Sequence, residues 1–263
     1  MTTNDSGAPG LAGVTALVTN DDGIESPGLH QLAKAALDEG LTVIIAAPQT
    51  QSSGSSASLI GAETDGRISF ERRELDGLEG IPAFAVEAAP ALIALISAHG
   101  AFGPVPDLVL SGINRGANVG RAILHSGTVG AALTGGVNGA RGLAVSLDVG
   151  MDPLRCHWSA ALPFIRELLP ALLHQPRGTV FNLNVPNIDE GTLELREGTL
   201  ATFGIVQTTM AKSGEENVRL SVSDTPTGQD AASDAALLDA GFATVTNIVS
   251  IVQASAPALI VAT

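Results

Sequence analysis

The chain has 263 residues, of which 45% are hydrophobic and 15% are charged. This apolar share is enough to build a buried core, so a chain that is disordered throughout is excluded. With 27 acidic and 13 basic residues the formal net charge is −14, which opposes binding to a nucleic-acid polymer. A single cysteine, Cys156, excludes an intramolecular disulfide and fits a reducing compartment, so we expect a cytoplasmic protein. No apolar run is long enough to span a membrane, so we expect no membrane partner.

The first part of the chain predicts a strand–helix–strand unit. Residues 1–13 are mostly small and polar, and we expect them to form a disordered tail. The apolar run at 14–19 predicts a strand, and segment 26–40, which opens on Ser-Pro and closes on glycine, predicts a helix. The continuous apolar run at 41–47 predicts a second strand that is covered on both faces.

The same alternation continues through residue 186. Helices are predicted at 90–99, 127–137 and 158–173, and strands at 108–110, 143–147 and 179–185. Strands that alternate with helices indicate an α/β fold with a Rossmann-like, doubly wound and mostly parallel sheet. We therefore predict a core domain over 14–186. In such sheets, ligands bind beyond the carboxyl ends of the strands, so we expect the functional site in the loops that follow strands.

Residues 187–263 have a different pattern, which predicts a C-terminal extension. Turn-rich alternating stretches around 201–209 and 217–222 predict a β-hairpin arm. A short helix near 233–238 and an edge strand at 243–249 are predicted to follow. Because an exposed hairpin favours aggregation unless it pairs with another subunit, we predict that the extension mediates oligomerisation.

Two loops contain side chains that suit a cation. Asp21 and Asp22 directly follow the first predicted strand, and in a loop both carboxylates can reach one hard cation, which prefers oxygen ligands. The alternative is a turn with local side-chain hydrogen bonds that leads into a capped helix. The serine-rich loop at 52–56 follows the second strand. It can ligate a metal or cradle a phosphate, or it can be a flexible surface linker.

The most informative segment runs from Ser111 to Ala132. Its glycines permit positive φ angles or a close approach of backbone, and Ser126-Gly127-Thr128 opens a helix. The free amides and the dipole at a helix N-terminus favour an anion, so this segment predicts a phosphate site. A glycine-tolerant crossover packed tightly on the sheet remains an alternative for some of these glycines.

Motifs of several other enzyme classes are missing from the sequence. It contains no G-x-x-x-x-G-K-[ST], G-x-G-x-x-G, H-E-x-x-H or G-x-S-x-G motif. Its only lysines are Lys34 and Lys212, and neither follows a predicted buried strand. This absence disfavours response-regulator receivers and haloacid-dehalogenase-type phosphatases, which share an acidic first loop but need a lysine near the phosphoryl group.

Taken together, these blocks resemble the SurE family of survival-protein nucleotidases. The resemblance is carried by four ordered blocks: Leu17–Ile24 with Pro27-Gly28, Ala47-Pro48 with Ser53-Gly54, Ser111–Asn114 with Gly116 and Asn118, and Ser126–Ala132. It implies a Rossmann-like fold with a C-terminal extension that is used in homodimers and tetramers. It also implies metal-dependent 5′/3′-nucleotidase and phosphomonoesterase activity.

The resemblance also implies roles for individual residues. One divalent cation, Mg²⁺ or Mn²⁺, is expected on Asp21, Asp22, Ser53 and Asn114, and the substrate phosphate is expected near Asn118, Ser126, Gly127 and Thr128. His125 replaces the tyrosine usual in the family and is predicted to contact the substrate.

The predicted reaction is the hydrolysis of nucleoside monophosphates to nucleoside and phosphate. A metal-activated water would attack phosphorus, with Asp21 and Asp22 as the catalytic residues. The alternative is a non-catalytic protein that binds a nucleotide or phosphate through the same loops.

Overall fold

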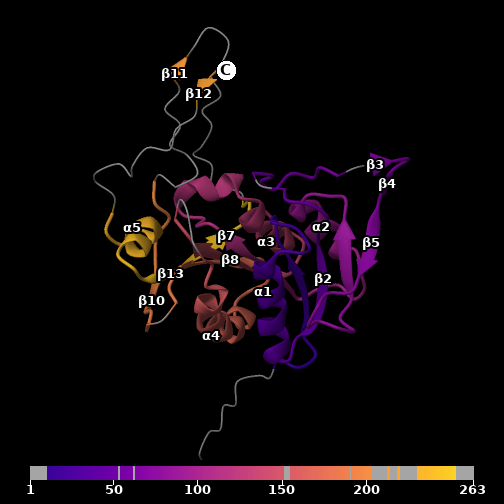
Figure 1. The fold of residues 1–263 in the computed structure, drawn as a ribbon, viewed down its shortest axis with the longest axis horizontal. Helices are drawn as coiled ribbons and strands as arrows, with labels where there is room; N and C mark the ends of the chain where they lie inside the picture. Colours follow the sequence, from indigo (N-terminus) through magenta and orange to yellow (C-terminus); the bar gives the residue numbers. More distant parts are fainter. Residues whose placement is uncertain are drawn as a thin grey trace, which may run out of the picture.

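A nine-stranded sheet forms the centre of the molecule (Figure 1). The computed structural model describes residues 11–52, 54–61, 63–150, 155–189, 191–202, 212–213, 218–219 and 230–252. In chain order, the strands of this sheet are β1 (Thr15–Thr19), β2 (Thr42–Pro48), β5 (Phe70–Arg73), β6 (Ala83–Val86), β7 (Leu108–Arg115), β8 (Arg141–Asp148), β9 (Thr179–Pro186), β10 (Leu195–Glu197) and β13 (Ala243–Val249).

The six central strands are parallel, as the sequence predicts. The spatial order is β10-β13-β9-β8-β7-β1-β2-β6-β5, and the strands from β9 through β6 all run in the same direction. Antiparallel pairing occurs only toward the two margins of the sheet, between β5 and β6 and between β13 and β9. The Rossmann-like α/β prediction is therefore confirmed.

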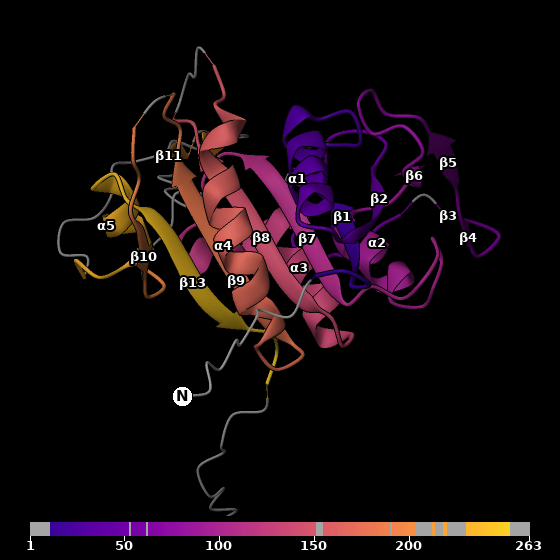
Figure 2. The same ribbon diagram turned by 90° about the horizontal axis from the view of Figure 1, so that it is seen from below.

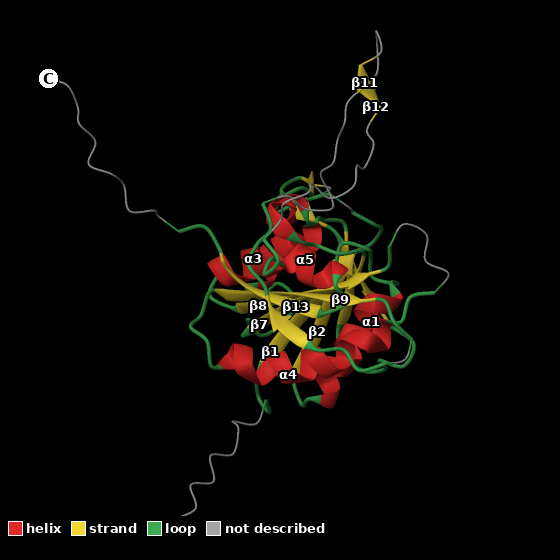
Figure 3. Cartoon of the chain, turned by 90° about the vertical axis from the view of Figure 1, so that its left-hand side faces the viewer, coloured by secondary structure: helices red, strands yellow, loops and turns green. Residues whose placement is uncertain are grey.

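Helices cover both faces of the sheet. They are α1 (Pro27–Asp38), α2 (Pro90–Ser97), α3 (Gly127–Val137), α4 (Leu162–Leu173) and α5 (Asp234–Asp239), with short 3₁₀ helices η1 (Gly120–His125) and η2 (Trp158–Ala161). Figure 3 shows α1 and α4 on one face and α3 and α5 on the other. Figure 2 shows α4 in front of β8 and β9, with β13 alongside β9. α2 packs beside α3.

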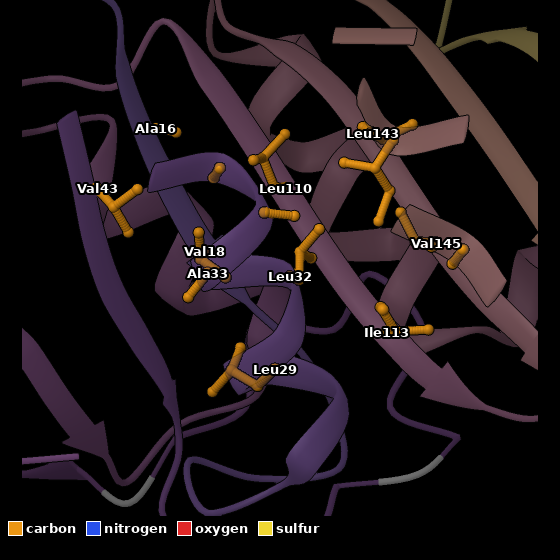
Figure 4. Close-up of a cluster of buried hydrophobic side chains, with 14 of the residues drawn as sticks. Ala16, Val18, Leu29, Leu32, Ala33, Val43, Leu110, Ile113, Leu143 and Val145 are labelled. Carbon is orange, nitrogen blue, oxygen red and sulfur yellow. The ribbon is translucent and has the colours of Figure 1, made fainter. Parts of the chain in front are cut away.

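The main core lies between α1, α4 and the sheet. Leu29, Leu32 and Ala33 of α1 face the central strands, where they meet buried aliphatic side chains such as Val18 and Leu110 (Figure 4). Ser26 caps the helix by accepting a hydrogen bond from the Leu29 amide through its Oγ, which confirms the predicted start of the helix. Local capping and apolar spacing therefore both direct α1 onto the sheet.

α1 approaches β7 so closely that only glycine fits at one position. A Cβ on Gly28 would lie 2.1 Å from the carbonyl oxygen of Ile113. This contact fixes the start of α1 against Ile113, the residue before Asn114 near the end of β7. Packing in the core thus determines the distance between two segments that carry candidate site residues.

Three predicted elements differ from the structure. The predicted edge strand at 243–249 is β13, which lies between β10 and β9, because the short β10 pairs along its outer side. The helix predicted at 158–173 is divided into η2 and α4, with Pro163 in the first turn of α4. The strand predicted at 108–110 extends to Arg115 as β7.

The predicted hairpin arm lies largely outside the described residues. Within them, β11 (Lys212–Ser213) pairs antiparallel with β12 (Val218–Arg219), apart from the main sheet (Figure 1). A second small pair joins β3 (Glu63–Thr64) and β4 (Arg67–Ile68). Among the helices that the structure describes, none combines the length and the apolar character that crossing a bilayer requires.

Replacing Gly28 with alanine tests the close packing of α1 on β7. Helix propensity alone would favour alanine, but the new Cβ would clash with backbone. We expect Gly28→Ala to lower the free energy of unfolding by about 2 kcal/mol. Gln31→Ala, on the partly exposed side of the same helix, is the control and should change it by less than about 0.5 kcal/mol in urea denaturation. Equal stability of the two variants would contradict this account.

Candidate metal and phosphate site

The candidate site lies at the topological switch point of the sheet, where strands β2 and β7 lie on opposite sides of β1. β1 has β2 on one side and β7 on the other, and the chain proceeds from β1 to β2 before it returns to β7. Ligands of open α/β sheets bind outside the carboxyl ends of the strands at such a switch point. Asp21 and Asp22 follow β1, and Asn114 lies near the end of β7. The fold therefore brings these three side chains to the same edge.

Asp21 is the more deeply buried of the two adjacent carboxylates, at 6% exposure. Its Oδ1 accepts a 2.6 Å hydrogen bond from the Thr128 hydroxyl, and its backbone carbonyl accepts one of 2.7 Å from the Ser52 amide. A Cβ on Gly127 would lie 2.9 Å from Asp21 Oδ2, so glycine permits this packing. Burial raises the pKa of Asp21 to about 6; the Thr128 hydroxyl opposes the shift and repulsion from Asp22 adds to it.

Asp22 joins the first loop to the end of β7. Its Oδ2 accepts a 3.2 Å hydrogen bond from the backbone amide of Arg115, the residue after Asn114. Burial raises the pKa of Asp22, while the Arg115 amide and the Arg115 charge both lower it. This side chain remains partly open to solvent. Asp22 is thus held beside the end of β7, which carries Asn114, and stays partly exposed.

Asn114 and Ser53 complete the ligand set implied by the family resemblance. The Asn114 Nδ2 donates a 2.7 Å hydrogen bond to the carbonyl oxygen of Gly116, which fixes the orientation of its amide. No hydrogen-bond donor of the described chain reaches Asn114 Oδ1, so this oxygen is free to bind a ligand. Ser53 lies outside the described residues, so only its predicted role stands.

The donor set fits a hard divalent cation. Two carboxylates and an amide oxygen are the ligands that Mg²⁺ and Mn²⁺ prefer, and a positive charge would offset both the burial of Asp21 and its repulsion by Asp22. Within the described ranges there is no cluster of three or more His, Cys, Asp or Glu side chains that could hold a metal. The site therefore depends on a mixed set of carboxylate and neutral oxygens.

The raised pKa of Asp21 makes a prediction about stability. The unfolded chain releases this proton near pH 3.8 and the folded chain near pH 6, so without a cation the folded state loses stability as pH rises from about 4 to 6. We expect Asp21→Asn, measured in EDTA, to raise the free energy of unfolding by up to about 3 kcal/mol at pH 7.5. The two proteins should converge below about pH 4. Asp38→Asn, at an exposed site, is the control. An Asp21→Asn protein that is less stable than wild type at pH 7.5 would contradict the expected gain.

The substrate phosphate is predicted to lie at the start of α3, where the structure shows how each side chain is held. Ser126 caps the helix by accepting a hydrogen bond from the Val129 amide, so its own hydroxyl proton remains available. The Thr128 hydroxyl donates to Asp21 instead of pointing away from it, which makes Thr128 an orienting residue for that carboxylate. The Gly127 amide stands at the helix N-terminus. His125 ends η1 and is exposed beside this turn.

The loop that carries Asn118 is clamped to the sheet by two asparagines of β9. The Asn118 amide donates a 2.7 Å hydrogen bond to Asn184 Oδ1, and its carbonyl accepts bonds of 2.8 Å from Asn182 Nδ2 and Asn184 Nδ2. The Asn118 side chain in turn donates to the Ser146 hydroxyl. All four residues are buried. The backbone of the predicted phosphate-binding loop is therefore held by the sheet itself.

The C-terminal extension holds the same loop from its other side. Asp234, fully buried at the start of α5, accepts a 2.8 Å hydrogen bond from the Gly120 amide through Oδ2. Its Oδ1 accepts bonds from the amides of Ala201 and Ala235. Val119 packs against Ala201, Ala235 and Leu238 of the extension. Residues from both the core and the extension therefore position this loop.

Sequence reasoning identified the acidic loop and the start of α3 but gave no role to the asparagines of β9 or to Asp234. One available signal was the spacing of Asn182 and Asn184, which places two amides on the same face of a strand that is otherwise apolar. A buried amide in such a strand needs hydrogen-bond partners, and here the partners are the backbone groups of Asn118. Asp234 offered no comparable signal, because its contacts are distant in sequence.

Removing the side-chain amide of Asn184 should loosen the loop that carries Asn118. Asn184→Leu would leave the buried backbone N–H of Asn118 unpaired and remove one of two donors to its carbonyl. We expect a loss of about 2–3 kcal/mol in unfolding free energy, because unpaired buried polar groups are costly. Amide exchange over 116–120 should accelerate. Asn247→Leu, at an exposed position of β13, is the control, and unchanged exchange in the first variant would contradict the clamp.

The fold and site define an α/β protein that can bind a cation through oxygen ligands and an anion at a helix N-terminus. The chain belongs to the SurE family: residues 16–213 match the family described as survival protein SurE. This match includes Asp21, Asp22, Asn114 and the start of α3, and it ends before Asp234 and Ala235 of the extension.

Curated relatives agree with this assignment. The chain is 38% identical over 192 residues to a 5′-nucleotidase SurE of Methanopyrus kandleri, an alignment that covers 70% of this chain and 71% of that protein. It is 35% identical over 241 residues to a 5′-nucleotidase SurE of Symbiobacterium thermophilum, covering 88% and 91%. A 5′/3′-nucleotidase SurE of Shigella dysenteriae is 36% identical over 174 residues, covering 65% and 63%.

A solved structure supports the fold. The crystal structure of the SurE protein from Aquifex aeolicus superimposes with a TM-score of 0.68 at 24% sequence identity, and the match covers 89% of this chain and 93% of that one. Similarity at this level of identity supports the architecture alone.

Proposed function

We propose that this chain is a metal-dependent nucleotidase that hydrolyses nucleoside monophosphates to nucleoside and phosphate. The observation that carries the proposal is the meeting of Asp21, Asp22 and the end of β7 beside the N-terminus of α3. This arrangement pairs oxygen ligands for a cation with donors for a phosphate. Membership of a family whose relatives are named 5′-nucleotidases supports the same reaction.

Asp21, Asp22, Asn114 and Ser53 would hold one Mg²⁺ or Mn²⁺. A cation there supplies Lewis-acid stabilisation of the phosphoryl group and lowers the pKa of a nearby water. Asp21 is fixed by Thr128 and serves as the rigid ligand. Asp22 engages the Arg115 amide through Oδ2, which leaves Oδ1 to orient the attacking water and to accept its proton.

The phosphate would lie against the start of α3. The Gly127 amide and the Ser126 hydroxyl donate toward its oxygens, and Asn118 contacts it from the clamped loop. These donors offset the negative charge that develops on the phosphoryl oxygens during in-line attack. His125, exposed at the end of η1, contacts the substrate at the mouth of the site.

The proposed assembly is a homodimer or tetramer that forms through the hairpin arm of the extension. The described parts of this arm, β11 and β12, pair with each other and lie apart from the main sheet. Sedimentation of the full chain distinguishes a monomer from either assembly.

Metal removal and substitution of the proposed ligands test the reaction. Phosphate release from AMP should be lost in EDTA and restored by Mn²⁺. Asp22→Asn and Asn114→Ala, assayed with saturating Mn²⁺, should each lower kcat/KM by at least about a hundredfold, because each removes a group that acts at the phosphoryl centre. Asp38→Asn and Asn247→Ala are the matched controls on the surface.

Two outcomes would count against the proposal. Near-wild-type rates in both site variants would remove Asp22 and Asn114 from the mechanism. Binding of AMP without any phosphate release, with Mg²⁺ or Mn²⁺ present, would favour a protein that only binds nucleotides.

A further inference from the structure

Arg115 lies at the candidate site, and none of the roles assigned above uses its side chain. It directly follows Asn114, one of the proposed cation ligands, and is the last residue of β7. Its backbone amide donates a 3.2 Å hydrogen bond to Asp22 Oδ2. The base of the Arg115 side chain is therefore fixed next to the acidic loop.

The guanidinium group of Arg115 is not engaged by the described part of the chain. The side chain is exposed, and the ion pairs among the described residues do not include it. Its charge still acts on the site, because burial raises the pKa of Asp22 whereas the Arg115 amide and the Arg115 charge both lower it. The guanidinium group thus lies close to this carboxylate without forming an ion pair with it, and its N–H donors are available to a ligand.

Arg121 is the other arginine in segment 114–128, but the structure ties it to a different part of the chain. It belongs to η1, and its backbone amide donates a 3.0 Å hydrogen bond to the carbonyl oxygen of Ala201 in the C-terminal extension. Arg115, in contrast, contacts the loop that carries Asp22. Arg115 is therefore the arginine of this segment that is held against a proposed cation ligand.

The charge balance of the proposed site leaves room for a further positive group. A divalent cation would balance the carboxylates of Asp21 and Asp22 and leave the charge of a phosphate dianion uncompensated. The N-terminus of α3 contributes only about half an elementary charge. The chain as a whole, with a formal net charge of −14, provides no general attraction for an anion. An arginine adds a full positive charge that does not depend on pH in the physiological range.

We propose that Arg115 is a further phosphate-binding residue, whose guanidinium group contacts the non-bridging oxygens of the substrate phosphoryl group from the side of β7. The proposal rests on the proposed nucleotidase function. The planar guanidinium group matches the geometry of phosphate oxygens, and in-line attack spreads negative charge over these oxygens. The amides at the start of α3 donate from the helix, so the two sets of donors reach the phosphoryl group from different elements. Arg115 thus orients Asp22 through its backbone and binds the phosphate through its side chain.

Binding of inorganic phosphate tests this role without any catalysis. Titration calorimetry with Mg²⁺ present should show that wild-type protein binds phosphate. Arg115→Gln removes the charge but keeps a long side chain with hydrogen-bond donors, and it should weaken this binding at least about tenfold. Arg115→Lys keeps the charge and should bind phosphate more tightly than Arg115→Gln. Arg67→Gln, at an exposed position of β4, is the control and should bind like wild type. Failure of wild type to bind phosphate, or equal binding by Arg115→Gln, would overturn the proposal.

Binding of Mg²⁺ without phosphate shows whether Arg115 acts on the anion or on the cation ligands. Because the charge of Arg115 repels a cation, Arg115→Gln should bind Mg²⁺ at least as tightly as wild type. Titration calorimetry in phosphate-free buffer makes this comparison. Weaker Mg²⁺ binding by Arg115→Gln would mean that the residue supports the metal ligands instead of the phosphate, and it would overturn the proposal.

Hydrolysis of AMP separates the role of Arg115 from the proposed reaction. In Arg115→Gln, kcat/KM should fall at least about tenfold, and Arg115→Lys should recover part of the loss. If wild type hydrolyses AMP but Arg115→Gln matches Arg67→Gln in both kcat/KM and phosphate binding, the role of Arg115 fails and the nucleotidase function stands. If phosphate binding depends on Arg115 but wild type hydrolyses no phosphomonoester, the proposed function fails and the anion-binding role stands.

Discussion

The burial of a carboxylate at the end of the first strand is the constraint around which the site is organised. Asp21 follows β1 and is enclosed by Ser52 and by the start of α3. There the Thr128 hydroxyl donates a hydrogen bond to its carboxylate, and Gly127 leaves room for it. Such burial is costly for a charged group, as its raised pKa shows. A folded protein retains an arrangement of this kind when a ligand or a reaction compensates for the cost.

The second part of the site depends on polar groups at positions where an α/β sheet is usually apolar. Asn182 and Asn184 satisfy both backbone groups of Asn118, and Asp234 holds the Gly120 amide from the opposite side. The loop between them packs through Val119, whose partners belong to the extension. Its shape is therefore imposed by β9 and by the C-terminal extension, which acts as a structural part of the site.

Much of the fold was predictable because local signals agreed with the tertiary structure. The Ser26 cap, the apolar face of α1 and the start of α3 at Gly127 all appear in the structure as the sequence predicts. β5, whose residues are all exposed, gave no usable alternation, and the place of β13 depended on the short strand β10 pairing beside it. In the site, Asp21 and Asp22 were recognisable from their position after β1. The roles of Thr128, Asn184 and Asp234 were not, because they arise from pairings between residues 66 to 114 positions apart.

The bond from Gly120 to Asp234 has a consequence for how the protein matures during translation. The two residues are 114 positions apart, so the ribosome must synthesise most of the chain before the loop acquires its anchor. A nascent polypeptide that already contains the whole parallel sheet still lacks this contact. Completion of the site is thereby coupled to completion of the polypeptide: a fragment truncated before α5 would lack this anchor and also β13, the neighbour of β9 in the sheet.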